Sequence, residues 1–158
     1  MRLKIVSLMG ALLLATACSS SQNAAGTAGQ GGLGTAGTAV PGSQQDLAQN
    51  IGDRVFFAFD AFDLSPEAQA TLTKQSGWLQ QYQNVAVTVE GHADERGTRE
   101  YNLALGDRRA NSVRNYLIAN GVAPSRISTI SYGKERPAVP GNDESAWAQN
   151  RRAVTVVN

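Results

Sequence analysis

The sequence predicts an α/β fold, one mixed and mostly parallel sheet with helices packed on it, over residues 49–158. Two observations predict it. Segments with the period of a strand alternate with segments with the period of a helix, which favours right-handed crossovers and parallel pairing of the first three strands. A length of about 110 residues also suits one sheet and its helices in a single domain.

The first half of this region holds a strand, a helix and a second strand. Residues 54–59 are apolar and aromatic and predict a buried strand. Ser65-Pro66-Glu67 is typical of a helix start, because Ser can act as N-cap, Pro suits the first helical position and an acid suits the first turn. Residues 85–90 alternate Val with smaller or polar residues, which is the period of a half-buried strand.

The second half repeats the pattern. Thr98 can cap a helix that runs to Asn120, where the next residue is a glycine that can end it. Residues 127–132 predict a third strand. A loop with two prolines then leads to a short helix over residues 144–150, and residues 153–157 predict a last strand.

Residues 1–17 are typical of a secretory signal peptide. Arg2 and Lys4 precede an apolar run that is shorter than the roughly 20 residues a membrane-spanning helix needs. Cys18 is the only cysteine, so no intramolecular disulfide can form. It follows small residues at the end of the apolar run, a position similar to the acylated cysteine of a bacterial lipobox. We therefore expect Cys18 to carry lipid, and Ser19 behind it implies sorting to the outer membrane.

Residues 18–48 predict a flexible tether between this anchor and the domain. They are rich in Ser, Gln, Ala, Thr and Gly, and they lack the apolar periodicity that could offset the entropy of ordering. No Asp, Glu, Lys, Arg or His occurs between Ile5 and Gln45. The whole chain has a net charge of +1, which gives no strong field towards nucleic acid, and we expect no nucleic-acid partner.

The most informative motif is Gly-His-Ala-Asp-Glu-Arg-Gly-Thr at residues 91–98. Asp94 lies in this loop, which feeds the second predicted helix. Asn102 and Arg109 are seven residues apart on that helix and lie within ~20° on one face, with Leu105 between them. An acid and an arginine offset in this way can hold the ammonium and the carboxylate of one zwitterionic ligand. The alternative is a structural Asp94–Arg109 salt bridge, since surface pairs are common.

With this motif, the Arg-Arg-Ala at 108–110 and the Asn-Arg-Arg-Ala at 150–153, the sequence resembles the OmpA-like peptidoglycan-binding domain, most of all its Pal branch of lipoproteins. The resemblance covers nearly the whole domain, from about Val55. It implies an OmpA-like βαβαβ-type sandwich that holds peptidoglycan non-covalently and faces the periplasm. It also implies TolB as a partner and a role of the Tol-Pal system in cell division, the alternative being a wall anchor outside that system.

The resemblance also implies which residues bind the wall. The family's loop Asp, which meets the ammonium of diaminopimelate, corresponds to Asp94, and the Arg that meets the carboxylate corresponds to Arg109. The family's helix Asn and its apolar neighbour correspond to Asn102 and Leu105.

One position departs from the family pattern. Many relatives carry an acid in the first strand where this chain has Ala58. A contact from that strand would then come from backbone groups or from Asp60.

A wall hydrolase is the alternative class of function. The carboxylates that could form a catalytic pair are Asp60, Asp63, Asp94 and Glu95. Nothing in their spacing requires catalysis, so we expect a binding module, with no enzyme activity and no cofactor. His92 has no second His beside it and makes a poor metal site, so we expect it to shape the loop through hydrogen bonds.

Overall fold

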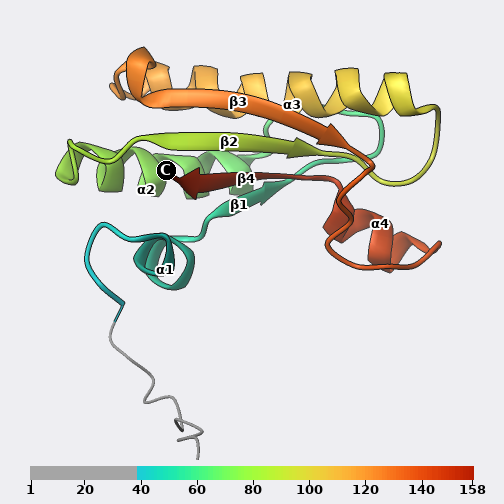
Figure 1. Ribbon diagram of the computed structural model, residues 1–158, viewed down its shortest axis with the longest axis horizontal. Coiled ribbons are helices and arrows are strands. Elements are labelled where there is room, and N and C mark those ends of the chain that lie inside the picture. The colour runs from blue at the N-terminus through green and yellow to red at the C-terminus, as the bar shows by residue number, and fades with distance from the viewer. Residues whose placement is uncertain (1–38) are drawn as a thin grey trace, which may run out of the picture. The chain divides into compact units, whose positions relative to one another are not determined.

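The computed structural model describes residues 39–158, so Cys18, the expected signal peptide and most of the expected tether lie outside it. Four strands form one mixed sheet in the order β1-β4-β2-β3 (Figure 1). The strands are β1 (Arg54–Phe56), β2 (Val87–His92), β3 (Ile127–Gly133) and β4 (Arg152–Val157). The predicted α/β class, one sheet with helices against it, is confirmed.

The pairing of the strands requires one correction. β2 and β3 pair in parallel, with Val87 opposite Ile127, but β4 lies between β1 and β2 and is antiparallel to both. The first three strands share a direction, yet β1 does not pair with β2, and only one of the three neighbouring pairs is parallel. The periodicity of a segment reports which face is buried and carries no information on strand order. The residues of β4 therefore gave no indication that this strand lies between β1 and β2.

The helices α2 (Pro66–Gln81) and α3 (Arg99–Ala119) pack against each other and against the sheet (Figure 1). Both begin where the sequence predicts. The side chains of Ser65 and Thr98 accept hydrogen bonds from the backbone N–H groups of Ala68 and Tyr101. The core between helices and sheet contains the buried side chains of Leu72, Leu79, Val87, Val89, Ala110, Val113 and Leu117.

Two glycines allow the backbone of α3 to lie in contact with the backbone of β2. A Cβ on Gly91 would lie 1.8 Å from the carbonyl oxygen of Gly106, and a Cβ on Gly106 would lie 2.3 Å from Oγ of Ser131. No side chain fits at either position. This contact fixes α3 against the end of β2, next to the loop that carries Asp94.

The folded part begins earlier than residue 49. α1 (Gln44–Asp46) and the π-helical turn η1 (Leu47–Ile51) precede β1, and Leu47 is fully buried. The carboxylate of Asp46 accepts a hydrogen bond from the indole of Trp78 at 2.9 Å. The folded part therefore begins before the expected tether boundary at residue 48, which composition could not indicate because a unit with one buried leucine is too short to show periodicity.

The first strand is also shorter than the aromatic run predicts. β1 ends at Phe56, and Phe57 is buried, but Phe59 is 61% exposed and belongs to the loop before α2. At the same end of the sheet, α4 (Glu144–Asn150) precedes β4, as the sequence predicts (Figure 1). The remaining helical turn is η2 (Pro124–Arg126), before β3. Within residues 39–158, no helix is both long enough and apolar enough to cross a membrane.

Candidate functional site

The five residues that the sequence singles out line one pocket of about 180 Å³. The pocket lies between the β1–α2 loop, the β2–α3 loop and the first turns of α3. It is lined by Asp60, Asp94, Asn102, Leu105 and Arg109, together with Phe59, Arg96, Gly97 and Tyr101. The structure thus brings together residues that are up to 49 positions apart in the sequence.

Arg109 is a fully buried cation, and no carboxylate among residues 39–158 is bonded to it. Its Nε, Nη1 and Nη2 atoms donate to the backbone carbonyls of Ala61, His92 and Ala58 at 2.8, 2.8 and 3.1 Å. A guanidinium has five N–H donors, so one N–H on each terminal nitrogen is left without a partner among residues 39–158. Backbone carbonyls of the loop after β1 and of the last residue of β2 therefore position this cation.

The pKa of Arg109 is shifted by this environment. Burial lowers the pKa to about 10, and the charge of Asp94 opposes that shift. The guanidinium is still protonated at neutral pH. It places a fixed positive charge in the lining of the pocket, and two of its N–H groups have no partner among residues 39–158, which is an arrangement suited to a carboxylate.

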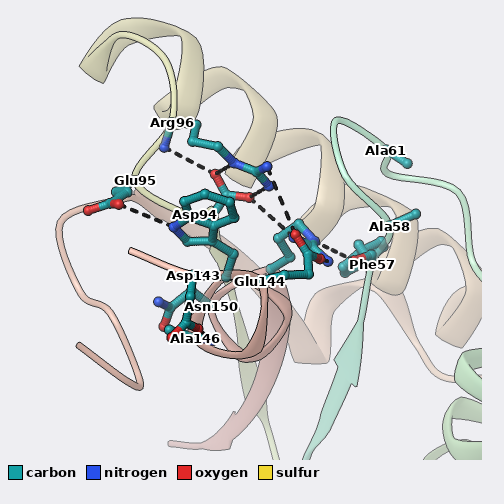
Figure 2. Close-up of polar contacts among 12 residues, drawn as sticks. Phe57, Ala58, Ala61, Asp94, Glu95, Arg96, Asp143, Glu144, Ala146 and Asn150 are labelled. Atoms are coloured by element: carbon teal, nitrogen blue, oxygen red, sulfur yellow. Dashed lines mark hydrogen bonds and ion pairs between the residues drawn. The ribbon is translucent and has the colours of Figure 1, made fainter. Parts of the chain in front are cut away.

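Asp94 is buried and already paired, but not with Arg109. Arg96 bonds both carboxylate oxygens, with Nε to Oδ1 at 3.1 Å and Nη2 to Oδ2 at 2.5 Å (Figure 2). Arg151 Nη1 lies 3.5 Å from Oδ2. The alternative of a direct Asp94–Arg109 salt bridge is wrong. Burial alone raises the pKa of Asp94, but the hydrogen bonds from Arg96 outweigh it and hold the pKa below its usual value.

Arg96 and Arg151 are site residues that the sequence reasoning missed. Arg96 stacks between two rings, with its Cζ atom 4.1 Å from the centroid of Phe59 and 4.0 Å from that of Trp147. Arg151 reaches the site from the turn between α4 and β4. Arg96 follows Asp94 by two residues and could have been suspected, whereas the contacts of Trp147 and Arg151 depend on the placement of α4 and have no local indication.

The remaining predicted residues contribute in different ways. Asn102 is buried, and its Nδ2 donates to the backbone carbonyl of Arg96 at 2.9 Å, so it holds the loop that carries Asp94. Leu105 is buried and gives the pocket an apolar wall. Asp60 is exposed at the rim, has a positive φ of 54°, and accepts a hydrogen bond from the hydroxyl of Tyr101.

The expectation that the ring of His92 shapes the loop through hydrogen bonds is wrong. Both ring nitrogens are buried and have no hydrogen-bond partner in the described part of the chain, and Nε2 lies 3.6 Å from Oε2 of Glu90. Burial lowers the pKa of His92 to about 4, and the positive charges of Arg152 and Arg136 add to the shift. His92 therefore acts through its backbone carbonyl, which binds Arg109. Within residues 39–158, no cluster of three or more His, Cys, Asp and Glu residues could hold a metal ion.

Comparison with known proteins places the chain in a family. The model of the OmpA family matches residues 56–151. A peptidoglycan-associated lipoprotein of Agrobacterium fabrum (strain C58) is 55% identical over 153 residues, which cover 97% of this chain and 86% of that protein. A peptidoglycan-associated lipoprotein of Haemophilus influenzae is 44% identical, and the match covers 92% of this chain and 91% of that protein.

Solved structures agree with this assignment. The crystal structure of the peptidoglycan-associated lipoprotein from Burkholderia pseudomallei superposes with a TM-score of 0.67 at 38% identity, covering 72% of this chain and 100% of that one. The C-terminal domain of Helicobacter pylori MotB shares the fold, with a TM-score of 0.63 at 22% identity, and the match covers 67% of this chain and 84% of that one. The chain therefore belongs to the OmpA family, in its group of peptidoglycan-associated lipoproteins.

Proposed function

We propose that the protein binds peptidoglycan non-covalently and that its pocket holds the diaminopimelate of the stem peptide. The observation that carries the proposal is Arg109, a buried cation with two free N–H groups, in the same pocket as the buried acid Asp94. Diaminopimelate ends in a carbon that bears both an ammonium and a carboxylate. Arg109 is suited to the carboxylate and Asp94 to the ammonium, and the names of the relatives support a wall ligand.

Binding is supported over hydrolysis by the state of the acids. A general acid needs a raised pKa so that it still carries a proton near neutral pH. The pKa of Asp94 is instead lowered by Arg96, which keeps the carboxylate ionised. Incubation of the protein with purified sacculi should therefore leave the protein in the pellet and release no soluble muropeptides. Release of muropeptides would reassign the protein to the hydrolases.

The proposal includes an anchor at Cys18 in the inner leaflet of the outer membrane, with the domain in the periplasm. Two or three acyl chains at ~0.8 kcal/mol per CH₂ hold a protein on a bilayer durably. The segment from Cys18 to about residue 38 then joins the membrane to the wall-binding domain. Cys18→Ser should give an unprocessed or soluble protein, checked by membrane fractionation.

As the component of a Tol-Pal system, the protein would also bind TolB and act in envelope integrity and cell division. The second candidate is a wall anchor that acts outside that system. A pull-down with purified TolB separates the two, because capture requires a specific interface and a bare wall anchor has none.

The wall-binding site is tested at Arg109. Arg109→Ala should weaken binding to diaminopimelate-type sacculi roughly ten- to a hundredfold, because a buried charge-assisted contact is worth ~1.5–3 kcal/mol. Arg109→Lys should rescue little, since Lys keeps the charge but loses the planar fork. Co-sedimentation over a range of protein concentrations measures the effect.

The matched control is Arg108→Ala. Arg108 is the adjacent residue on α3 and is exposed, with its guanidinium 5.7 Å from the ring centroid of Phe62 and outside the pocket. Its replacement should leave binding unchanged. Thermal melts accompany each variant, and a folded Arg109→Ala protein that sediments like wild type would place the binding site elsewhere.

A further inference from the structure

The acid half of the pocket is occupied by the protein's own cation. Three donors from Arg96 reach the carboxylate of Asp94: the backbone N–H and Nε both bond Oδ1 at 3.1 Å, and Nη2 bonds Oδ2 at 2.5 Å. Arg151 lies beside Oδ2 as well. A ligand ammonium that is to reach Asp94 must therefore displace one of these two guanidinium groups.

Arg96 is the group that can leave. The side chain of Arg151 is 8% exposed, and its Nε is bonded to the backbone carbonyl of Phe57 at 3.0 Å. The side chain of Arg96 is 31% exposed and sits at the mouth of the pocket, where only side-chain contacts hold its guanidinium. Its backbone N–H can stay on Asp94 while the guanidinium moves.

The structure also provides a place for the displaced charge. Nη1 of Arg96 already lies 4.0 Å from Oε2 of Glu144 on α4, and the Glu144 side chain is 65% exposed. The other oxygen of this carboxylate, Oε1, accepts a hydrogen bond from Nη2 of Arg151 at 2.6 Å, so Oε2 is the oxygen that would receive Arg96. The rings of Phe59 and Trp147 flank the guanidinium on both sides and can keep their stacking as it slides between them. Figure 2 shows Glu144 on the side of Arg96 and Asp94 that faces α4.

We propose that Arg96 is an internal competitor that holds the ammonium position on Asp94 in the empty pocket and yields it to the ligand by moving towards Glu144. This inference rests on the proposed binding of diaminopimelate. It makes Arg96 a specificity-determining residue. A ligand with a carboxylate alone leaves Arg96 on Asp94, and a ligand with an ammonium alone must displace Arg96 without engaging Arg109. Only a group that carries both charges on one carbon satisfies both halves.

The test is calorimetric titration of the full-length protein in detergent with the tripeptide L-Ala-γ-D-Glu-meso-diaminopimelate. Arg96→Gln removes the competing charge and should tighten binding roughly two- to tenfold, the range expected for loss of a partly exposed ion pair. The control is Arg99→Gln, which removes an equal charge from an exposed arginine paired with Glu135 outside the pocket. That variant should bind no more tightly than wild type.

A second measurement needs no variant that alters the pocket. In wild-type protein, the Nε–H resonance of Arg96 should shift on titration with the tripeptide, because its bond to Asp94 is broken. An unmoved resonance in the bound state, or an Arg96→Gln protein that binds with equal or lower affinity, overturns the inference. The failure of the proposed function is separate, since it would appear as no binding by wild type or as undiminished binding by Arg109→Ala.

Discussion

At the scale of single residues, the two charges of the pocket are held in opposite ways. Arg109 is bonded to three backbone carbonyls and to no carboxylate, so its charge is not neutralised by direct contact. Asp94 is bonded to Arg96 and lies within ion-pair distance of Arg151. The guanidinium of Arg109 therefore keeps two N–H groups for a ligand, whereas the carboxylate of Asp94 is already paired. The spacing of Asp94 and Arg109 predicts that they share a pocket, but it cannot reveal this difference, which depends on the loop after β1, on Arg96 and on Arg151.

The buried ring of His92 predicts a pH dependence of stability. Its pKa is about 4 in the folded protein and about 6.5 in the unfolded chain, so the unfolded chain binds more protons between these values. Stability from the neutral ring is fully present above pH 6.5 and is lost as the pH falls towards 4. The free energy of unfolding, measured with urea, should fall by up to about 3 kcal/mol over this window.

His92→Phe is the corresponding control. A phenyl ring keeps the packing against Tyr132, whose ring centroid is 5.6 Å from that of His92, and it cannot be protonated. The variant should lose most of the pH dependence between 6.5 and 4.5. Its Glu90, Arg136 and Arg152 neighbours remain, so an unchanged slope would assign the effect to them.

At the scale of elements, local patterns predict what forms, and long-range contacts decide where it lies. The caps Ser65 and Thr98 place the starts of α2 and α3 correctly because an N-cap is a contact between near neighbours. The position of β4 and the contacts of Trp147 join segments far apart in the sequence, and no pattern within one segment encodes them. Hence the predicted residues share one pocket, whereas the contacts of Trp147 and Arg151 required the structure.

The close contact of α3 with β2 is tested with Ala. Gly106→Ala should lower the free energy of unfolding by several kcal/mol, because its Cβ would lie 2.3 Å from Oγ of Ser131 and 2.9 Å from the carbonyl oxygen of Gly91. Gly77→Ala in α2 is the matched control, since its Cβ would meet nothing within 4 Å. That variant should gain about 0.5–1 kcal/mol from helix propensity. Chemical denaturation measures both, and equal effects would contradict the close-contact explanation.

At the scale of the whole molecule, the folded domain includes a segment that composition assigns to the tether. Leu47 is fully buried, and Asp46 receives hydrogen bonds from Trp78, Asn50 and Gly42. Composition is averaged over a long window of sequence. The low-complexity residues before position 40 dominate that average, so it does not indicate the short structured turn that follows them. The domain begins where the first apolar side chains of the chain pack into the core.

Truncation of the soluble domain distinguishes the two boundaries. A protein of residues 49–158 should unfold at a clearly lower temperature than one of residues 39–158, because burial of a leucine stabilises by about 2 kcal/mol and the Trp78 indole loses its acceptor. Removal of residues 19–38 from the full-length protein should leave the melting temperature of the domain unchanged. Equal melting temperatures for the two soluble domains would restore the boundary at residue 49.

The place of β4 in the sheet has a consequence for biogenesis. It is the last of the four strands along the chain, and yet both of its edges are paired, with β1 on one side and β2 on the other. β1 and β2 therefore cannot become part of one sheet until residues 152–157 have arrived. On the proposed export and anchoring, a chain that crosses a membrane from its N-terminal end would stay unfolded throughout its passage. Attachment at Cys18 would then be complete before the domain closes, and folding would begin on a chain already fixed to its membrane.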